Sequence, residues 1–436
     1  MIKIRNWGLL VLATAALSFP AIVGAGGAPE GRAPVIRITY MTHEDPNRTR
    51  LEEELIAQFM EQNPDIVVTR VTQPSGVLAN TVLTAFAAGQ GPTMFNTGIT
   101  NLTQFLERDR LAPARPEFLG VSSLDAFIGR YVPGTLDPMM RNGSLYGVPL
   151  ELTNLVILVN DRMFRRAGLD PNVDVPSTWE EMMEVSSQIV VRDGDIIERR
   201  GFDFRYGGEL LWLPAMVEQL GGQLVSDDGG TAIVNDEAWL QVLSFLQEWG
   251  PDGRNLGSPA YTDARRVFNF DNEVAMTHSG QYQFARIRND NIEFYESREF
   301  RGIPFPRWEN AVNDVPSPFT GHYWVVNAQA SAAEQEAAWR LIAFFASHSV
   351  DFWETVGVRM PTNEVLASEG YLNSVSADVF TDELRNGSIV FHALPALRIA
   401  AALRDAVNDV MLDGVSPQAA LNSLRREAQL AIDEEG

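Results

Sequence analysis

The segment Met276–Tyr282 places a histidine and a serine beside a glycine, directly after an apolar run. Such a pair could supply the nucleophile and base of a hydrolase. The elbow of many serine hydrolases requires a glycine two residues before and two residues after the serine. Here position 277 is a threonine and Gly280 directly follows Ser279, so the spacing is wrong for an elbow. The segment instead predicts the end of a buried strand, after which Gln281 and Tyr282 face a ligand.

Two other kinds of chemistry can be considered from residue types. Glycoside hydrolysis needs two carboxyl groups about 5 to 10 Å apart, but no motif singles out a pair among the 57 acidic residues. A metal site needs ligands at a recognisable spacing. His43, His278 and His322 fall on segments predicted to border one cleft, yet no two have such a spacing. We therefore predict no catalytic activity and no metal or cofactor, and expect these histidines to hydrogen-bond a ligand.

The composition is that of an acidic globular chain. Its 436 residues suffice for about two or three domains. With 34 basic and 57 acidic residues the net charge is −23, which disfavours binding to nucleic acid. Lys3 is the only lysine, so Schiff-base chemistry and a P-loop are excluded. The absence of cysteine excludes disulfides and thiolate metal sites.

The N-terminus has the pattern of a secretory signal peptide. Lys3 and Arg5 provide a positively charged start, and the apolar run Trp7–Leu17 is too short to cross a bilayer. Small residues at Val23–Ala25 offer a cleavage site, so residues 1–25 are predicted to be removed. No cysteine is present there to carry a lipid. We expect a soluble periplasmic protein.

Strand and helix patterns alternate in the first part of the chain. Val35–Tyr40 alternates like a strand, and apolar residues at helical spacing follow over Leu51–Phe59. Two more strands are predicted at Ile66–Val71 and Thr93–Phe95, with a helix over Leu78–Ala88 between them. Strands that alternate with helices predict βαβ units around a mainly parallel sheet, and hence an α/β fold.

Two apolar passages, at residues 152–159 and 323–326, divide the chain. They predict two α/β lobes joined by crossing segments, with a ligand cleft between the lobes. Within the second part, Thr178 and Glu181 have the spacing of a capping box at a helix start. The predicted boundaries are residues 35–150 plus about 323–365 for the first lobe, and 151–322 plus about 366–436 for the second.

Seven spaced motifs follow one another along the chain. They are Phe59-x-x-x-Asn63-Pro64-x-Ile66-x-Val68, Tyr146-Gly147-Val148-Pro149, Asn160-x-x-x-Phe164-x-x-Ala167-Gly168-Leu169, Pro176-x-Thr178-Trp179-Glu180-Glu181, Ala275-Met276-x-x-x-Gly280, the helix around Trp339–Phe345, and Gly357-x-x-x-Pro361-Thr362. In this order they resemble family 1 of the extracellular solute-binding proteins of ABC importers, the carbohydrate-binding group that includes maltose-binding protein. Two positions depart from the family's pattern: Thr93 replaces the usual aspartate, and Val159 the usual tyrosine.

The resemblance implies a two-lobe periplasmic-binding-protein fold of type II that closes on a sugar by hinge bending. The closed form would dock on the permease subunits of an ABC importer in the membrane, and the protein would act as a monomer. Because of the two departures, the identity of the ligand stays open. The alternatives are a polyol, a sugar phosphate or a peptide on the same scaffold, and an exported glycoside hydrolase.

Sugar recognition combines aromatic faces with planar hydrogen-bonding groups. By its place in the motif that contains Met276 and Gly280, Tyr282 is expected to stack on a sugar ring, with Gln281 beside it. A phosphate ligand would instead recruit several arginines, for which Arg48, Arg205 and Arg359 are candidates. The other predicted ligand-binding residues come from strand-end loops, the apolar passages and a helix: His43, Glu44, Thr97, Asn101, Glu151, Trp212, His322, Trp324 and Arg359.

Overall fold

The computed structural model describes residues 35–233, 235–270 and 273–435. The predicted signal peptide, residues 1–25, lies outside the described residues. Among the helices of the described part, none combines the length and the apolar character that a membrane crossing requires.

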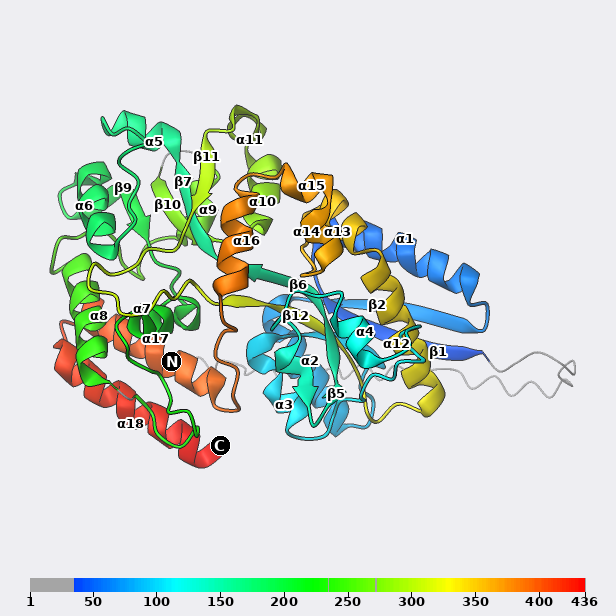
Figure 1. The fold of residues 1–436 in the computed structure, drawn as a ribbon. Helices are drawn as coiled ribbons and strands as arrows, with labels where there is room; N and C mark the ends of the chain where they lie inside the picture. Colours follow the sequence, from blue (N-terminus) through cyan, green and yellow to red (C-terminus); the bar gives the residue numbers. More distant parts are fainter. Residues whose placement is uncertain (1–34, 234, 271–272, 436) are drawn as a thin grey trace, which may run out of the picture. The chain divides into compact units, whose positions relative to one another are not determined.

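The first of two five-stranded sheets has the strand order β2-β1-β3-β12-β6 (Figure 1). In this sheet β1 runs parallel to β2 and β3, whereas β12 is antiparallel to β3 and β6. The strands are β1 (Ile36–His43), β2 (Ile66–Gln73), β3 (Met94–Gly98), β6 (Gly147–Asn154) and β12 (Phe319–Val326).

The second sheet has the order β11-β7-β10-β9-β8, and only β10 and β9 are parallel in it. Its strands are β7 (Val156–Asn160), β8 (Val191–Asp193), β9 (Ile196–Asp203), β10 (Val274–Ser279) and β11 (Phe300–Ile303). Both sheets are therefore mixed, and the expectation of a mainly parallel sheet is wrong. The connections from β6 to β7 and from β11 to β12 pass between the sheets without a helix, and a two-residue turn joins β8 to β9, so these strands are not tied to a parallel direction by helical crossovers.

The chain passes from the first sheet to the second at the predicted apolar passage 152–159. A single residue, Leu155, separates the end of β6 from the start of β7. The chain returns from the second sheet to the first through residues 304–318, which join β11 to β12. The predicted second passage, residues 323–326, is therefore not a connection between the sheets but part of strand β12. The lobe boundaries at 150 and 322 fall within β6 and β12 and remain a prediction.

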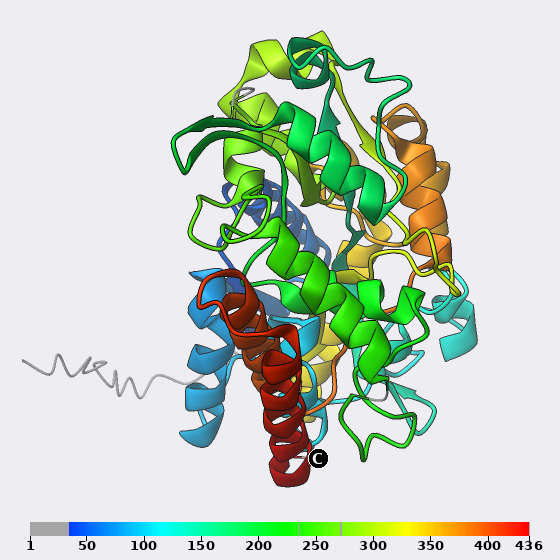
Figure 2. The same ribbon diagram turned by 90° about the vertical axis from the view of Figure 1, so that its left-hand side faces the viewer.

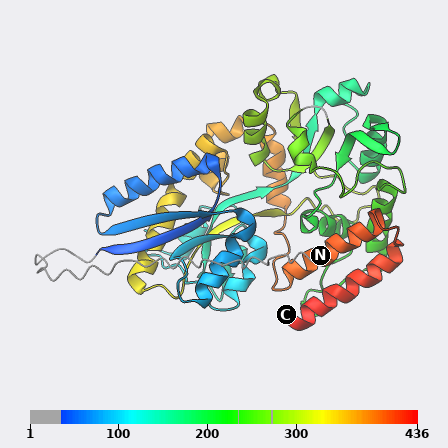
Figure 3. The same cartoon turned by 180° about the vertical axis from the view of Figure 1, so that it is seen from behind.

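The longer helices agree with the sequence pattern to within a few residues, and Figure 3 shows α1 running along the strands of the first sheet. The helices that precede α11 are α1 (Pro46–Gln62), α2 (Ser75–Ala87), α3 (Thr103–Leu106), α4 (Leu124–Ile128), α5 (Asp161–Arg166), α6 (Trp179–Ile189), α7 (Leu213–Gln219), α8 (Asp236–Trp249), α9 (Ala264–Phe268) and α10 (Tyr282–Asp290). The later ones are α11 (Ile292–Ser297), α12 (Ala332–Ser347), α13 (Ser349–Val356), α14 (Asn363–Ala367), α15 (Glu369–Leu372), α16 (Ala377–Asn386), α17 (Ala396–Met411) and α18 (Pro417–Glu435). A short hairpin pairs β4 (Met140–Arg141) with β5 (Ser144–Leu145).

The C-terminal helices α17 and α18 pack against each other and against α8 (Figure 2). Their amphipathic pattern, read from the sequence, thus serves to cover helix α8 of the second half of the chain. The predicted capping box at the start of α6 is confirmed: Thr178 Oγ1 accepts from the N–H of Glu181 at 3.1 Å, and the Glu181 carboxylate accepts from the N–H of Thr178 at 3.2 Å.

A buried ion pair fixes the end of β1 against α1. The side chains of Arg48 and Glu52 are fully buried, and Arg48 Nε lies 2.9 Å from Glu52 Oε1. The other end of the guanidinium donates to Thr42 Oγ1 at 3.0 Å and to the carbonyl of His43 at 3.1 Å. Glu52 also accepts from Tyr40 Oη at 2.9 Å. The last residues of β1 are therefore held by charge-assisted hydrogen bonds.

Replacing Glu52 by alanine should lower the free energy of unfolding by about 3–5 kcal/mol, because it leaves the Arg48 charge buried without its carboxylate. Urea denaturation measures the change. Glu54→Ala is the matched control on the same helix, since its ion pair with Arg50 spans 3.9 Å and both side chains are exposed. The control should cost less than about 1 kcal/mol. Equal losses in the two variants would contradict this role for the buried pair.

Candidate ligand-binding cleft

A cavity of about 570 Å³ collects the ends of strands from both sheets. On the side of the first sheet it is lined by His43, the last residue of β1, and by Gly98, the last residue of β3. On the side of the second sheet it is lined by Gln281 and Tyr282, which follow β10. We call this cavity the cleft. Its volume and its position at strand ends are typical of small-molecule sites.

Nine of the eleven predicted ligand-binding residues line the cleft. Their contact with a ligand stays a prediction, but the fold brings together residues that lie far apart in the sequence. They are His43, Glu44, Thr97, Asn101, Glu151, Gln281, Tyr282, His322 and Arg359.

The two predicted tryptophans lie in the core instead, and this corrects the expectation for both. The ring of Trp212 packs on Phe204 with 4.6 Å between ring centres, and its Nε1 donates to the carbonyl of Arg205 at 3.0 Å. The ring of Trp324 is fully buried, and its Nε1 donates to Tyr40 Oη at 2.9 Å. Each indole N–H therefore donates a hydrogen bond to a group inside the protein and needs no ligand as acceptor.

The serine and histidine of the segment Met276–Tyr282 do not interact as a nucleophile and its base. Both residues lie on β10, where successive side chains point to opposite faces of the sheet. His278 Nε2 lies 3.0 Å from Ser317 Oγ, whereas Ser279 Oγ donates to Gln283 Oε1 at 3.1 Å. The structure therefore gives these two side chains separate buried partners.

His43, Glu151 and His322 form a polar cluster on the first-sheet wall of the cleft. Nδ1 of His322 lies 2.7 Å from Oε1 of Glu151, and the rings of the two histidines are 4.4 Å apart between centres. One potential ligand atom from each residue lies within 4.8 Å of the others, a grouping that could hold a metal ion. However, Arg48 Nη1 lies 3.4 Å from His43 Nε2, and its positive charge opposes a cation there. The cluster is better suited to hydrogen bonds with hydroxyl groups.

Two side chains contact the ring of His43. Asn96 Oδ1 accepts from the backbone N–H of His43 at 2.9 Å, and Asn96 Nδ2 lies 2.8 Å from His43 Nδ1. On the other side of the ring, Arg48 Nη1 lies 3.4 Å from His43 Nε2, and the positive charge of this guanidinium favours a neutral imidazole. Burial, together with the positive charge of Arg48 and the proximity of His322, lowers the pKa of His43 to about 3.

Glu151 is held in its charged form. Although burial acts in the opposite direction, the hydrogen bond and charge of His322 lower the pKa of Glu151 to about 2. The first-sheet wall therefore presents an ionised acceptor at neutral pH, next to imidazole groups that can donate or accept.

The second-sheet wall is arranged around Tyr282 and carries three arginines. Arg205 Nη1 donates to Tyr282 Oη at 3.3 Å, and the guanidinium of Arg286 lies 4.9 Å from the centre of the Tyr282 ring. Burial alone would raise the pKa of Tyr282, but the charges of Arg205 and Arg265 lower it to about 8. The sequence analysis missed Arg265 and Arg286. The latter could have been found, because it lies four residues after Tyr282 on a helix.

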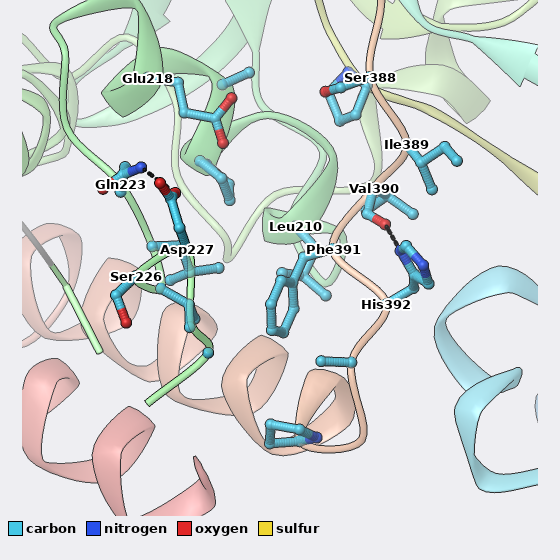
Figure 4. Close-up of a pocket in the computed structure, with 18 of the residues that line it drawn as sticks. Leu210, Glu218, Gln223, Ser226, Asp227, Ser388, Ile389, Val390, Phe391 and His392 are labelled. Carbon is cyan, nitrogen blue, oxygen red and sulfur yellow. Dashed lines mark hydrogen bonds between the residues drawn. The ribbon is translucent and has the colours of Figure 1, made fainter. Parts of the chain in front are cut away.

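A second cavity of about 1030 Å³ lies between residues 210–229 and residues 388–395 (Figure 4). Figure 4 shows Phe391 and Leu210 side by side at its centre, with the polar side chains of Glu218 and Asp227 at one side. None of the eleven predicted residues lines it. We favour the smaller cleft as the ligand site because it joins strand ends to titratable groups with shifted pKa values.

The family model for the bacterial extracellular solute-binding protein matches residues 45–351. The chain belongs to this family. A Brucella abortus protein described as a binding protein is 22% identical over 451 residues, which cover 98% of this chain and 99% of the relative. An arabinooligosaccharide-binding protein of Halalkalibacterium halodurans is 24% identical over 202 residues, or 45% of this chain and 42% of that protein.

Solved structures of this class share the fold. A Thermotoga lettingae ABC transporter solute-binding protein bound to α-D-tagatose superposes with a TM-score of 0.77 at 19% identity, covering 91% of this chain and 100% of that one. The maltose/maltodextrin-binding domain of Bdellovibrio bacteriovorus, bound to maltotriose, gives 0.75 at 20% identity and covers 92% and 100%. The predicted two-lobe α/β fold of type II is confirmed.

Stability should fall as the pH is lowered from about 6.5 toward 3, because the unfolded chain protonates His43 while the folded protein keeps it neutral. The folded-state pKa of about 3 implies that His43 removes about 2 kcal/mol of stability at pH 5 relative to pH 7.5. His43→Gln should therefore lose about 2 kcal/mol less than the wild type over this interval. Urea denaturation at pH 7.5 and at pH 5 measures the free energy of unfolding of both proteins. An equal loss of stability in the wild type and in the variant would show that folding does not lower the pKa of His43.

Proposed function

We propose that this protein is the substrate-binding component of an ABC importer and captures a carbohydrate in the cleft. The observation that carries the proposal is the composition of the cleft walls. One wall presents the half-buried ring of Tyr282, and the opposite wall presents the Glu151–His322 pair and the amide of Asn101. An aromatic face with carboxylate, imidazole and amide groups is what the apolar and hydroxyl faces of a sugar ring require.

The solved relatives support a sugar as the ligand class. The Thermotoga lettingae protein binds α-D-tagatose and the Bdellovibrio bacteriovorus domain binds maltotriose. The volume of the cleft, about 570 Å³, is sufficient for a mono- or oligosaccharide.

The proposed mechanism is closure of the two lobes on the ligand. A sugar that contacts the ends of β1 and β3 on one side and Tyr282 on the other favours the closed form, since only that form makes both sets of contacts. The segments that permit the movement are the short link at Leu155 and residues 304–318. The closed protein then delivers the sugar to the permease subunits in the membrane.

Export to the periplasm is part of the proposal, and it rests on the N-terminal signal-peptide pattern together with the extracellular family. The mature protein acts as a monomer and catalyses no reaction. Hydrolysis of a sugar that also binds would contradict the last of these statements.

Replacing Tyr282 by alanine should weaken sugar binding by about 1–3 kcal/mol, because the stacking face is lost. Isothermal titration calorimetry measures the change. Tyr295→Ala is a matched control: this tyrosine is also half-buried and lies under an arginine, with Arg298 4.6 Å from its ring centre, but it does not line the cleft. Unchanged affinity in the Tyr282 variant would remove the ring from the ligand contact.

A thermal-shift screen over mono- and oligosaccharides, polyols, sugar phosphates and peptides identifies the ligand class. A sugar at about a hundred times its Kd should stabilise the folded protein by about 2.7 kcal/mol. If only peptides shift the transition, the carbohydrate assignment is wrong.

A further inference from the structure

We propose that the bound carbohydrate carries an anionic group, a carboxylate or a phosphate, which binds to Arg205, Arg265 and Arg286 on the second-sheet wall of the cleft. This inference rests on the proposed function and narrows it to acidic carbohydrates. The shared chemistry is an oxyanion on a polyhydroxylated molecule.

The charge of this wall is opposite to that of the whole protein. The chain has a net charge of −23, yet three arginines and no acidic residue line the cleft on the second-sheet side. Within the described residues, the one carboxylate paired with them is Asp263, whose Oδ1 accepts from Arg265 Nε at 3.1 Å. Three cations thus face one anion, and guanidinium groups stay protonated at all physiological pH values.

The three side chains gather around Tyr282. Arg205 and Arg286 both contact Tyr282, the first through its hydroxyl at 3.3 Å and the second over its ring at 4.9 Å. Arg205 is itself held by its backbone, since its carbonyl accepts the indole N–H of the buried Trp212. Like charges that are gathered in one wall repel one another, and the half-buried Arg205 and Arg265 also lose hydration, so an oxyanion bound among the three arginines offsets both costs.

A buried amide without a partner in the described part of the chain lies next to Tyr282 in the sequence and lines the same cavity. Gln281 is 3% exposed, lines the cleft, and has no hydrogen-bond partner for its Nε2 or its Oε1 among the described residues. A buried amide without partners is costly, so a ligand atom that supplies one is favoured. Gln281 is also the N-cap of α10, a helix of nine residues, whose first N–H groups attract an anion.

The opposite wall gives the ligand its orientation. The acidic residues that line the cleft, Glu44, Asp45 and Glu151, all belong to the half of the cavity formed by the first sheet. Carboxylates accept hydrogen bonds from hydroxyl groups and repel an anion. The hydroxyl-bearing part of the ligand is therefore expected at the first sheet and its charged group at the arginines.

The test compares acids with neutral forms of the same skeleton in calorimetric titrations. The probes are galacturonate, glucuronate and mannuronate and their oligomers of two to four units, each against its methyl ester, and glucose 6-phosphate against glucose. The acid should bind at least about tenfold more tightly than its ester, because charge-assisted hydrogen bonds to arginine are lost on esterification. Raising the salt concentration should weaken binding of the acid and leave that of the ester unchanged.

Variants assign the effect to the arginines. Arg205→Gln and Arg286→Gln should each reduce the affinity for the acid by about tenfold and leave that for the ester within about threefold. Arg266→Gln and Arg288→Gln are the matched controls, since these exposed arginines lie on α9 and α10 but do not line the cleft. Both controls should keep the affinity of the wild type.

The outcomes separate this inference from the proposed function. If glucose 6-phosphate binds through the arginines and the uronates do not, the inference holds and the anion is a phosphate. If neutral sugars and esters bind as tightly as the acids, and the arginine variants do not discriminate between them, the inference is overturned while the proposed function stands. If no member of the panel binds and peptides do, both are overturned.

Discussion

A guanidinium group cannot give up its charge at physiological pH, so each arginine that folding removes from water must find a compensating group. The protein meets this constraint in two ways. Arg48 is fully buried and is neutralised by Glu52, and the pair holds the end of β1 where the cleft begins. The arginines around Tyr282 have only Asp263 as a carboxylate partner within the described structure, so their charge remains available to a ligand. The first arrangement fixes the end of β1 at the cleft, and the second is the basis of the proposed anion site.

The position of the cleft depends on how the chain passes between the sheets. Leu155 alone separates β6 from β7, so the walls of the cavity are joined by almost unbroken strand. The buried Arg359 supports this crossing, since its Nε donates to the carbonyl of Leu152 at 3.1 Å and its Nη2 to Asn154 Oδ1 at 2.7 Å. Residues from both sheets can then meet in one cavity although they lie up to about 300 positions apart in the sequence, which is the arrangement that interlobe ligand sites exploit.

Local patterns predicted the helices and most strands because hydrophobic periodicity and caps are local properties. Local patterns could not predict that β6 and β12 are neighbours in the first sheet. Their pairing depends on where the chain re-enters this sheet after it has formed the second one. The same limit applies to the cluster of His43, Glu151 and His322, which comes from three strands. Tryptophan type alone could not separate core from cleft, and Trp324 took a core position. Family position indicated the location of Tyr282, but not the arginines gathered around it.

The most direct test of the central claim is hydrogen–deuterium exchange of the mature protein with and without a sugar that shifts its thermal transition. Ligand in the cleft should slow exchange at both walls together, in peptides that cover residues 43–46 and 97–101 and in those that cover 281–286. Protection confined to residues 210–229 and 388–395, which line the larger cavity, would contradict the account and place the ligand there instead.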